Sequence, residues 1–198
     1  IGSDFDGIEG KLEISDASKM QMLSDALLKE KFTYDEIEKI FYKNEPTVLP
    51  EVFDAIKDAD LIILSMGSLY TSLMPHLICK DVVNAINNSK ARVMYVCNAM
   101  TQPGETDGFG VSDHVNAIEK YLGKDSINAV IVSNTVLPKK ILEKYAREEE
   151  KDFVKIDYEN IKKGKYEILE DDLLTTQDGT IKHDSLKLSS IIFSYLMR

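Results

Sequence analysis

The segment that most constrains the fold is residues 60–72, which read Asp-Leu-Ile-Ile-Leu-Ser-Met-Gly-Ser-Leu-Tyr-Thr-Ser. Its first half is a short apolar run with β-branched residues, typical of a strand buried on both faces of a parallel sheet. Gly67 and Ser68 then predict a turn, and the residues after them can begin a helix. Such a turn places backbone N–H groups and small hydroxyls at a helix N-terminus, where anions bind. An ordinary strand–helix turn, with Gly67 for backbone freedom and Ser or Thr as the cap, explains the same residues.

Strands and helices alternate along most of the chain. The hydrophobic patterns predict strands at 61–65, 92–97, 129–132, 153–156 and 166–169, and helices at 51–58, 81–88, 139–150 and 186–197. A further helix is capped by Ser112 and stopped by Gly123, and the helix after the Gly67 turn cannot run unbroken past Pro75. Residues 1–45 are expected to hold a small hairpin, a helix over 19–31 and a capping box at 33–36. This alternation predicts one α/β domain over residues 1–198, a Rossmann-like three-layer α/β/α fold with a mostly parallel sheet.

The composition excludes several classes of protein. The net charge is −10 and no basic block is present, which argues against a nucleic-acid-binding surface. The two cysteines form no C-x-x-C pair and read as reduced residues. No apolar run reaches the ~18–20 residues of a membrane helix, and no signal-peptide pattern opens the chain, so we expect a cytoplasmic protein. Because the chain begins at Ile1 without a methionine, we expect it to be a fragment.

Three predicted loops, 66–72, 98–110 and 133–138, follow consecutive parallel strands and should lie at one edge of the sheet. Ligands of open α/β sheets bind at that edge. The loop 98–110 is longer than the ~2–6 residues of a routine connection, and it offers an amide, threonines and carboxylates but no cation. It is either a ligand-binding loop or a loop stabilised by its own hydrogen bonds.

Several side chains in this region allow more than one role. Asp113 and His114 are either an acid–base pair or residues that stabilise and pack a helix start. Four side chains in this region could together hold Mg²⁺: Glu105, Asp107, Asp113 and His114. The alternative is that the acids are solvated, which is more common for acidic residues clustered in a loop. Cys97 with His114 would be a nucleophilic pair, but the apolar run before Cys97 favours a buried thiol.

Three motifs, in this order and spacing, resemble the gluconeogenesis factor family, which belongs with the 2-phospho-L-lactate transferases. They are Gly67-Ser-Leu-Tyr-Thr-Ser72 with Pro75, Asn98-x-Met-Thr-Gln-Pro-Gly-Glu-Thr106 and Ser112-Asp-His-Val115. The resemblance covers about residues 46–198. It implies a Rossmann-like fold that binds a nucleotide-containing ligand. The gluconeogenesis factors resemble cytosolic binders of UDP-sugars such as UDP-N-acetylglucosamine, linked to cell-wall synthesis and cell shape during gluconeogenic growth.

The transferase branch of the family implies a different function. Its members move phospholactate from a guanosine diphosphate donor to a deazaflavin acceptor and use a divalent metal, which the binders do not need. Between these two, the resemblance favours a non-catalytic binder of a nucleotide sugar, with Mg²⁺ as an additional ligand in the transferase alternative. A third hypothesis is an interaction module whose partners, such as regulators of cell-wall synthesis or a second copy in a homodimer, respond to nucleotide state.

This chain departs from the family pattern at several points. The Gly-Pro usual before the Gly67 motif is Ser65-Met66, and the N-terminal Gly-Gly-Gly-Thr-Gly-Leu strand–turn and an Asp-Asp-Gly-Gly-Ser motif are absent. Tyr145 matches a tyrosine of the sugar-nucleotide site, where a phenol can stack on uracil. Lys182 stands where an arginine is usual, which keeps the charge for a diphosphate but loses the bidentate fork. Ser185 stands where the family often has a threonine that resembles a phosphorylation target.

The resemblance and the loop analysis together give a predicted ligand site. The Gly67 turn would surround a phosphate or sugar hydroxyls, the long loop would line the polar edge of the ligand, and Tyr145 and Lys182 would meet the nucleotide. The predicted residues are Gly67, Ser68, Tyr70, Thr71, Ser72, Asn98, Thr101, Gln102, Glu105, Asp113, His114, Tyr145 and Lys182.

Overall fold

The computed structural model describes residues 47–176 and 179–198. Four strands of this part form one parallel sheet in the order β1-β2-β3-β4, namely Leu61–Leu64, Arg92–Val96, Ala129–Ser133 and Glu167–Asp171. A short antiparallel pair, β5 and β6, comprises Leu174–Thr175 and Lys182–His183. The predicted parallel α/β fold is therefore confirmed. The hairpin, helix and capping box expected in residues 1–45 lie outside the described residues.

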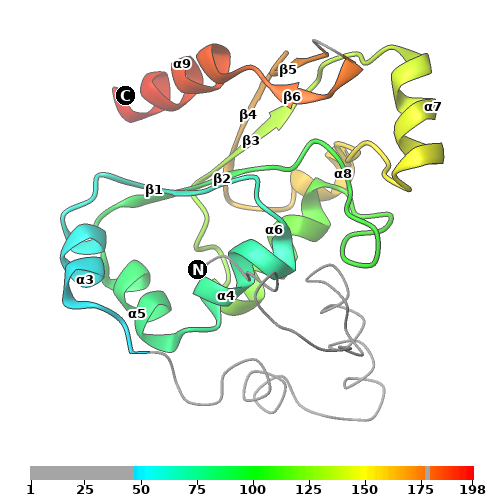
Figure 1. Ribbon diagram of the computed structural model, residues 1–198. Coiled ribbons are helices and arrows are strands. Elements are labelled where there is room, and N and C mark those ends of the chain that lie inside the picture. Colours follow the sequence, from blue (N-terminus) through cyan, green and yellow to red (C-terminus); the bar gives the residue numbers. More distant parts are fainter. Residues whose placement is uncertain (1–46, 177–178) are drawn as a thin grey trace, which may run out of the picture.

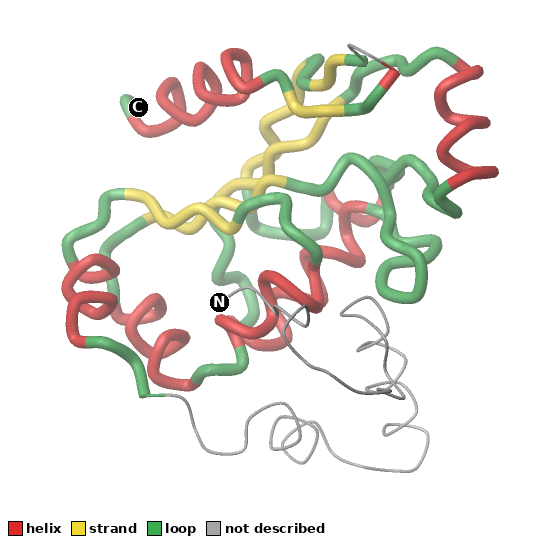
Figure 2. The backbone as a smooth tube through the Cα atoms, viewed as in Figure 1, coloured by secondary structure: helices red, strands yellow, loops and turns green. Residues whose placement is uncertain are grey.

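Helices cover both faces of the sheet, which gives the three layers seen in Figures 1 and 2. One face carries α3, α4, α5 and α6, which span Pro50–Lys57, Met74–Leu77, Lys80–Asn88 and Val111–Leu122. The other face carries α9, Ser185–Leu196. The remaining helices are η2, α7 and α8, which span Leu69–Leu73, Lys139–Glu148 and Tyr158–Ile161. None of the helices in the described ranges has both the length and the hydrophobicity that a bilayer crossing requires.

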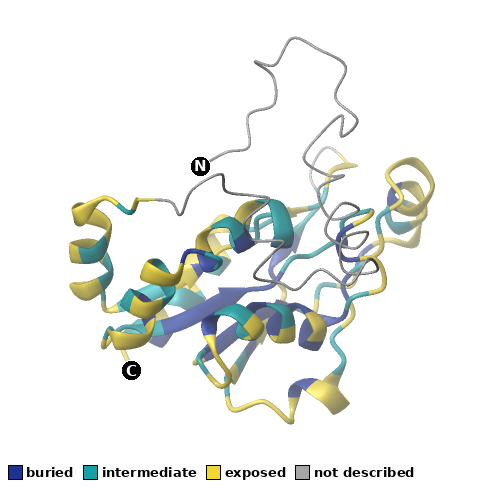
Figure 3. Ribbon diagram, turned by 90° about the horizontal axis from the view of Figure 1, so that it is seen from below, coloured by how far each residue is buried: buried dark blue, intermediate teal, exposed yellow. Residues whose placement is uncertain are grey.

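Alternate side chains of the central strands build two separate cores. On β2, Val93 and Tyr95 face the α5–α6 side, whereas Met94 and Val96 face α9, and all four are nearly inaccessible to solvent. This is why the strands read as continuous apolar runs. Figure 3 shows the buried strands between the partly exposed helices. The edge strand β1 differs, because its Ile63 is 42% exposed. The expectation that this strand is buried on both faces is therefore wrong, since α9 packs mainly over β2 and β3.

One further expectation about local structure is corrected. Residues 153–156 do not join the sheet; they make isolated bridges, Phe153 with Met100 and Lys155 with Gly110, because the long loop uses their backbone groups. The helical segment after the Gly67 turn does not run unbroken past Pro75, as predicted: the π-helix η2 ends at Leu73, and Pro75 lies in the first turn of the separate helix α4. A proline is tolerated there because the first-turn N–H groups have no partner within the helix. The predicted cap Asp184 is confirmed at the start of α9.

Candidate functional site

The loops after β1, β2 and β3 lie at the carboxyl edge of the parallel sheet, as the sequence predicts (Figure 1). The first of them contains Gly67 and leads into η2, a five-residue π-helix. The amides of Ser72 and Leu73 both donate to the Ser68 carbonyl at 3.0 Å. Single π-turns are rare and occur frequently at functional sites. A Cβ on Gly67 would lie 3.0 Å from Ser72 Cβ, so a larger residue at this position would force Ser72 to shift.

The Ser68 hydroxyl connects this turn to the long loop. It donates to the Glu105 carboxylate and accepts from the Thr71 amide at 3.2 Å and the Thr71 hydroxyl at 2.5 Å. Glu105 is only 6% exposed. Since a hydroxyl has one donor and two acceptor positions, Ser68 is fully engaged within the protein. Two neighbouring predicted site residues, Ser68 and Thr71, thus form one hydrogen-bonded unit with Glu105, which lies 37 positions after Ser68 in the sequence, and Ser68 acts as the cap of η2.

Asn98 makes a second connection between the same two loops. Its amide donates to the carbonyls of Met66 at 3.2 Å and Gly67 at 2.9 Å, and its side-chain oxygen accepts from the buried Tyr95 hydroxyl at 3.0 Å. The amide therefore fixes the entry to the Gly67 turn relative to the end of β2. The three interactions use two donors and one acceptor, a combination that among similar-sized side chains only asparagine provides.

The long loop is held mainly by hydrogen bonds of its own and by residues 152–155. Thr101 is buried, and its amide and hydroxyl both bond the backbone of Asp152, at 2.8 and 2.9 Å. The Gln102 amide donates to the Thr106 hydroxyl at 2.8 Å. These contacts agree with the alternative that the loop 98–110 is stabilised by its own hydrogen bonds. One group differs, because the Gln102 side-chain oxygen is buried and has no hydrogen-bond partner among the described residues.

The start of α6 holds Asp113 and His114 in different surroundings. The cap position is Gly110 and not Ser112 as predicted; Asp113 accepts from the Gly110 amide at 2.8 Å. A Cβ on Gly110 would lie 2.9 Å from an Asp157 carboxylate oxygen, so this approach requires glycine. Ser112 instead bonds Asp157, through its amide at 3.0 Å and its hydroxyl. Asp113 thus stabilises the helix start and remains exposed.

His114 is fully buried under this helix start. Its Nδ1 lies 2.8 Å from the Gly110 carbonyl, and its ring packs edge-on against Phe109 at 5.4 Å between centroids. Burial lowers the pKa of His114, while the Gly110 carbonyl and the charges of Asp113 and Asp157 oppose this shift. Its Nε2 has no partner in the part of the chain that the structure describes. This arrangement agrees with the packing role that the sequence left open.

Tyr145 contacts the backbone of the residue directly before Lys182. The Tyr145 hydroxyl accepts from the Ile181 amide at 3.0 Å, which ties α7 to the strand that carries Lys182. Tyr145 is 7% exposed, whereas Lys182 is exposed. The neighbouring His183 hydrogen-bonds the backbone of Cys97, so this strand lies against the end of β2; burial nonetheless lowers the His183 pKa.

The candidates for metal and thiol chemistry are engaged elsewhere. Glu105 and Asp113 accept the hydrogen bonds described above, and Asp107 accepts from the Gly104 amide at 2.7 Å. Residues 47–176 and 179–198 contain no group of three or more His, Cys, Asp or Glu side chains that could hold a metal ion. The described structure therefore does not gather the residues named for Mg²⁺ into one group, and Mg²⁺ binding stays a prediction. Burial raises the Cys97 pKa to about 12, so its thiol is protonated at neutral pH.

Sequence reasoning missed Asp157. This residue holds the start of α6 through Ser112 and also accepts from the Asn160 side chain at 3.1 Å. Burial acts to raise its pKa, but the hydrogen bonds from Ser112 and Asn160 outweigh it and lower the pKa. The available signal was an aspartate directly before a short helix, a common capping pattern that does not reveal a partner 45 residues away.

A parallel sheet with helices on both faces, and polar loops at its carboxyl edge, defines a Rossmann-like α/β protein. Comparison with known families identifies it further. The family of 2-phospho-L-lactate transferase CofD matches residues 6–174, and the chain belongs to this family.

Relatives and solved structures agree with this assignment. The chain is 43% identical over 162 residues to a Clostridium acetobutylicum protein named "Putative gluconeogenesis factor", covering 81% of this chain and 36% of the relative. It is 36% identical to the "Gluconeogenesis factor" of Bacillus subtilis, in a match that covers 75% of this chain and 46% of the relative. A crystal structure from Bacillus halodurans, described as a member of the UPF0052 family, superposes on this chain with a TM-score of 0.71. The two chains are 34% identical, and the match covers 75% of this chain and 47% of that structure. The chain thus spans about half or less of the length of these proteins.

Proposed function

We propose that the chain is a cytoplasmic UDP-sugar-binding regulatory protein, with a ligand of the UDP-N-acetylglucosamine kind, linked to cell shape and cell-wall synthesis during gluconeogenic growth. The observation that carries the proposal is the hydrogen-bonded unit of Ser68, Thr71 and Glu105 at the carboxyl edge of the sheet. Ligands of open α/β sheets bind at this edge. The relatives named gluconeogenesis factor support the biological context.

The chemistry of the edge suits a nucleotide sugar. Glu105 is a buried acceptor, which matches sugar hydroxyls and repels phosphate at the same spot. Lys182 supplies an exposed cation on β6, where a diphosphate would gain local attraction against the net charge of −10. The hydroxyls of Tyr70 and Ser72, on η2, add further polar groups beside the Gly67 turn.

Thermal unfolding of the 198-residue chain tests the proposal with UDP-N-acetylglucosamine, UDP-glucose, GDP, NAD⁺ and ATP, each with and without Mg²⁺. A ligand at ~100-fold its dissociation constant adds about 2.7 kcal/mol. For a chain of this size the expected rise in Tm is on the order of 5–10 °C. The rise should occur with UDP-sugars and be lost in Lys182→Ala. The matched control is Lys90→Ala, an exposed lysine two residues before β2, at the opposite edge of the sheet.

The second candidate is a transferase that moves a phospho-acid group from a nucleoside diphosphate. The family description, 2-phospho-L-lactate transferase, favours it. A rise in Tm with GDP that requires Mg²⁺ would support this candidate over the first. If no nucleotide raises the Tm, both candidates fail for this chain, and the hypothesis of an interaction module remains.

A further inference from the structure

The antiparallel pair of β5 and β6 carries Lys182, the exposed cation of the proposed ligand site. Each of the two strands has only two residues, in the register Leu174 with His183 and Thr175 with Lys182. Two-stranded pairs without further packing are marginally stable in water. The place of Lys182 relative to the sheet therefore depends on the groups that hold this pair from outside.

Two hydroxyls at the carboxyl end of β3 hold the beginning of β5. The Leu173 amide donates to the Ser133 hydroxyl at 3.1 Å. The Leu174 amide donates to the Thr135 hydroxyl at 2.9 Å. Both leucines are buried, and a buried backbone N–H without a partner is costly. Side-chain hydroxyls thus fix β5 to the end of β3.

The strand β6 is held on both sides of Lys182. Before it, the Ile181 amide donates to the Tyr145 hydroxyl. After it, the Asp184 amide donates to the Leu173 carbonyl at 2.7 Å. The amide of the same Leu173 is bonded to the end of β3, so this end of β3 fixes both strands of the pair.

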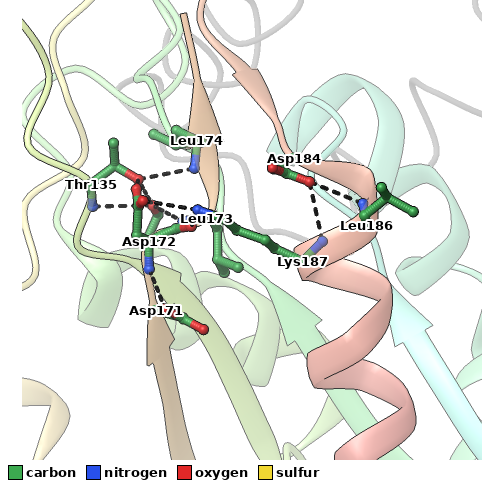
Figure 4. A network of polar contacts seen from close by, with 9 residues as sticks. Thr135, Asp171, Asp172, Leu173, Leu174, Asp184, Leu186 and Lys187 are labelled. Atoms are coloured by element: carbon green, nitrogen blue, oxygen red, sulfur yellow. Dashed lines mark hydrogen bonds and ion pairs between the residues drawn. The ribbon is translucent and has the colours of Figure 1, made fainter.

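The Thr135 hydroxyl is the centre of this network, as Figure 4 shows. It donates to the Asp172 carboxylate at 2.6 Å and accepts from the Leu174 amide, and the Ser133 hydroxyl lies 2.8 Å away. The hydrogen bonds from Thr135 and Lys187 lower the pKa of Asp172, which is therefore ionised at neutral pH. Because an ionised carboxylate only accepts, the Thr135 proton points to Asp172 and the Ser133 proton to Thr135. The one donor and two acceptor positions of the Thr135 hydroxyl are all used.

We propose that Thr135 is a positioning residue for the binding of a nucleotide sugar: it fixes, through β5, the point from which Lys182 reaches a diphosphate. The inference deepens the proposed function and rests on it. A lysine presents a compact charge on a flexible four-carbon stem, so the placement of its strand decides which phosphate it can meet. The Thr135 hydroxyl has no position left for a ligand. Its effect on binding therefore acts through Lys182 and is limited to the contribution of that cation.

Titration calorimetry of the 198-residue chain with UDP-N-acetylglucosamine tests the inference in a double-mutant cycle. A hydrogen bond to a charged group is worth roughly 10–100-fold in affinity, which is the loss expected in Lys182→Ala. Thr135→Val keeps the shape of the side chain but removes the hydroxyl, and it should weaken binding about 3–10-fold. Combined with Lys182→Ala, it should cause no further loss.

Two other variants serve as controls. Thr135→Ser keeps the hydroxyl and should bind like the wild type. Thr47→Val makes the same exchange of side chain at an exposed threonine before α3 and should also leave the affinity unchanged. Circular dichroism melts establish that all variants are folded.

Two results of the titrations would overturn the inference. One is wild-type affinity in Thr135→Val. The other is an equal loss from Thr135→Val in the wild-type and the Lys182→Ala backgrounds, which shows that the hydroxyl does not act through the cation. A wild-type chain that does not bind UDP-N-acetylglucosamine refutes the proposed function instead, and amide hydrogen exchange then decides the positioning role. Amides of residues 174–175 and 182–183 should exchange faster in Thr135→Val than in Thr135→Ser, and equal exchange overturns that role.

Discussion

The role of Asn98 can be tested by removing its side chain. Asn98→Ala deletes three hydrogen bonds: two to the carbonyls of Met66 and Gly67 and one from the Tyr95 hydroxyl. Each is worth about 0.5–1.5 kcal/mol, and a buried donor without a partner costs about 1–3 kcal/mol. Since Tyr95 is completely buried, we expect a loss of about 2–4 kcal/mol in the free energy of unfolding.

Chemical denaturation and thermal melting measure this loss. A change of about 1 kcal/mol lowers the Tm by roughly 2–4 °C in a chain of this size, so a loss of about 2–4 kcal/mol should lower it by about 4–16 °C. Asn98→Asp separates the contributions, because it keeps the acceptor for Tyr95 but loses both donors and sets a carboxylate against two carbonyls. The matched control is Asn88→Ala, whose amide bonds only the Asn84 carbonyl on an exposed helix surface. If Asn98→Ala unfolds within about 0.5 kcal/mol of Asn88→Ala, the idea that Asn98 fixes the Gly67 turn is wrong.

Three further predictions concern the supports of the site. Gly110→Ala should lower the free energy of unfolding by about 1–3 kcal/mol, because the new Cβ would lie 2.9 Å from the Asp157 carboxylate and 3.2 Å from the Lys155 carbonyl. Urea titration measures this loss, and an unchanged unfolding midpoint would contradict the close approach. Arg92→Met should lower the free energy of unfolding by about 1–3 kcal/mol, because the Arg92 guanidinium donates to the carbonyls of Tyr195 and Leu196 at the end of α9. Amide hydrogen exchange in residues 192–198 should become faster, and unchanged protection there would show that Arg92 does not hold the end of the helix. Stability should fall as the pH drops below 6.5, the usual His114 value, because burial keeps the folded imidazole neutral while the unfolded chain takes up a proton. His114→Gln should reduce this slope between pH ~7 and ~5, and an equal slope in both proteins would show that other groups cause it.

The sequence predicted the sheet well, because buried parallel strands are continuous apolar runs between helical segments. The predicted strands at 61–65, 92–97 and 129–132 match β1, β2 and β3. Residues 153–156 have the same local pattern, yet they bond the loop 98–110 instead of another strand. A short apolar run specifies an extended backbone but not its partner, so this error could not be avoided from local pattern alone.

The candidate site was predictable in position but not in detail. The parallel topology places the turn at Gly67 and the loop 98–110 at one edge, and the sequence showed this. It did not show that the Ser68 hydroxyl would be used by Glu105, 37 residues away. The π-helical turn also escaped prediction, because residues 69–73 have no pattern that separates a π-turn from an α-helical one. Both features depend on long-range contacts that local propensities do not encode.

The contacts divide the predicted site into two groups of residues with different roles. Ser68 and Asn98 use their hydrogen-bonding groups within the protein, so their effect on a ligand acts through the shape of the turn. The side chains of Ser72 and Lys182 are exposed at the same edge, so they are available to a ligand. Loss of binding in Ser68→Ala would therefore come with a loss of stability, whereas Ser72→Ala and Lys182→Ala should weaken binding at unchanged Tm of the free protein. Binding and melting data on the same variants thus distinguish residues that shape the site from residues that contact the ligand.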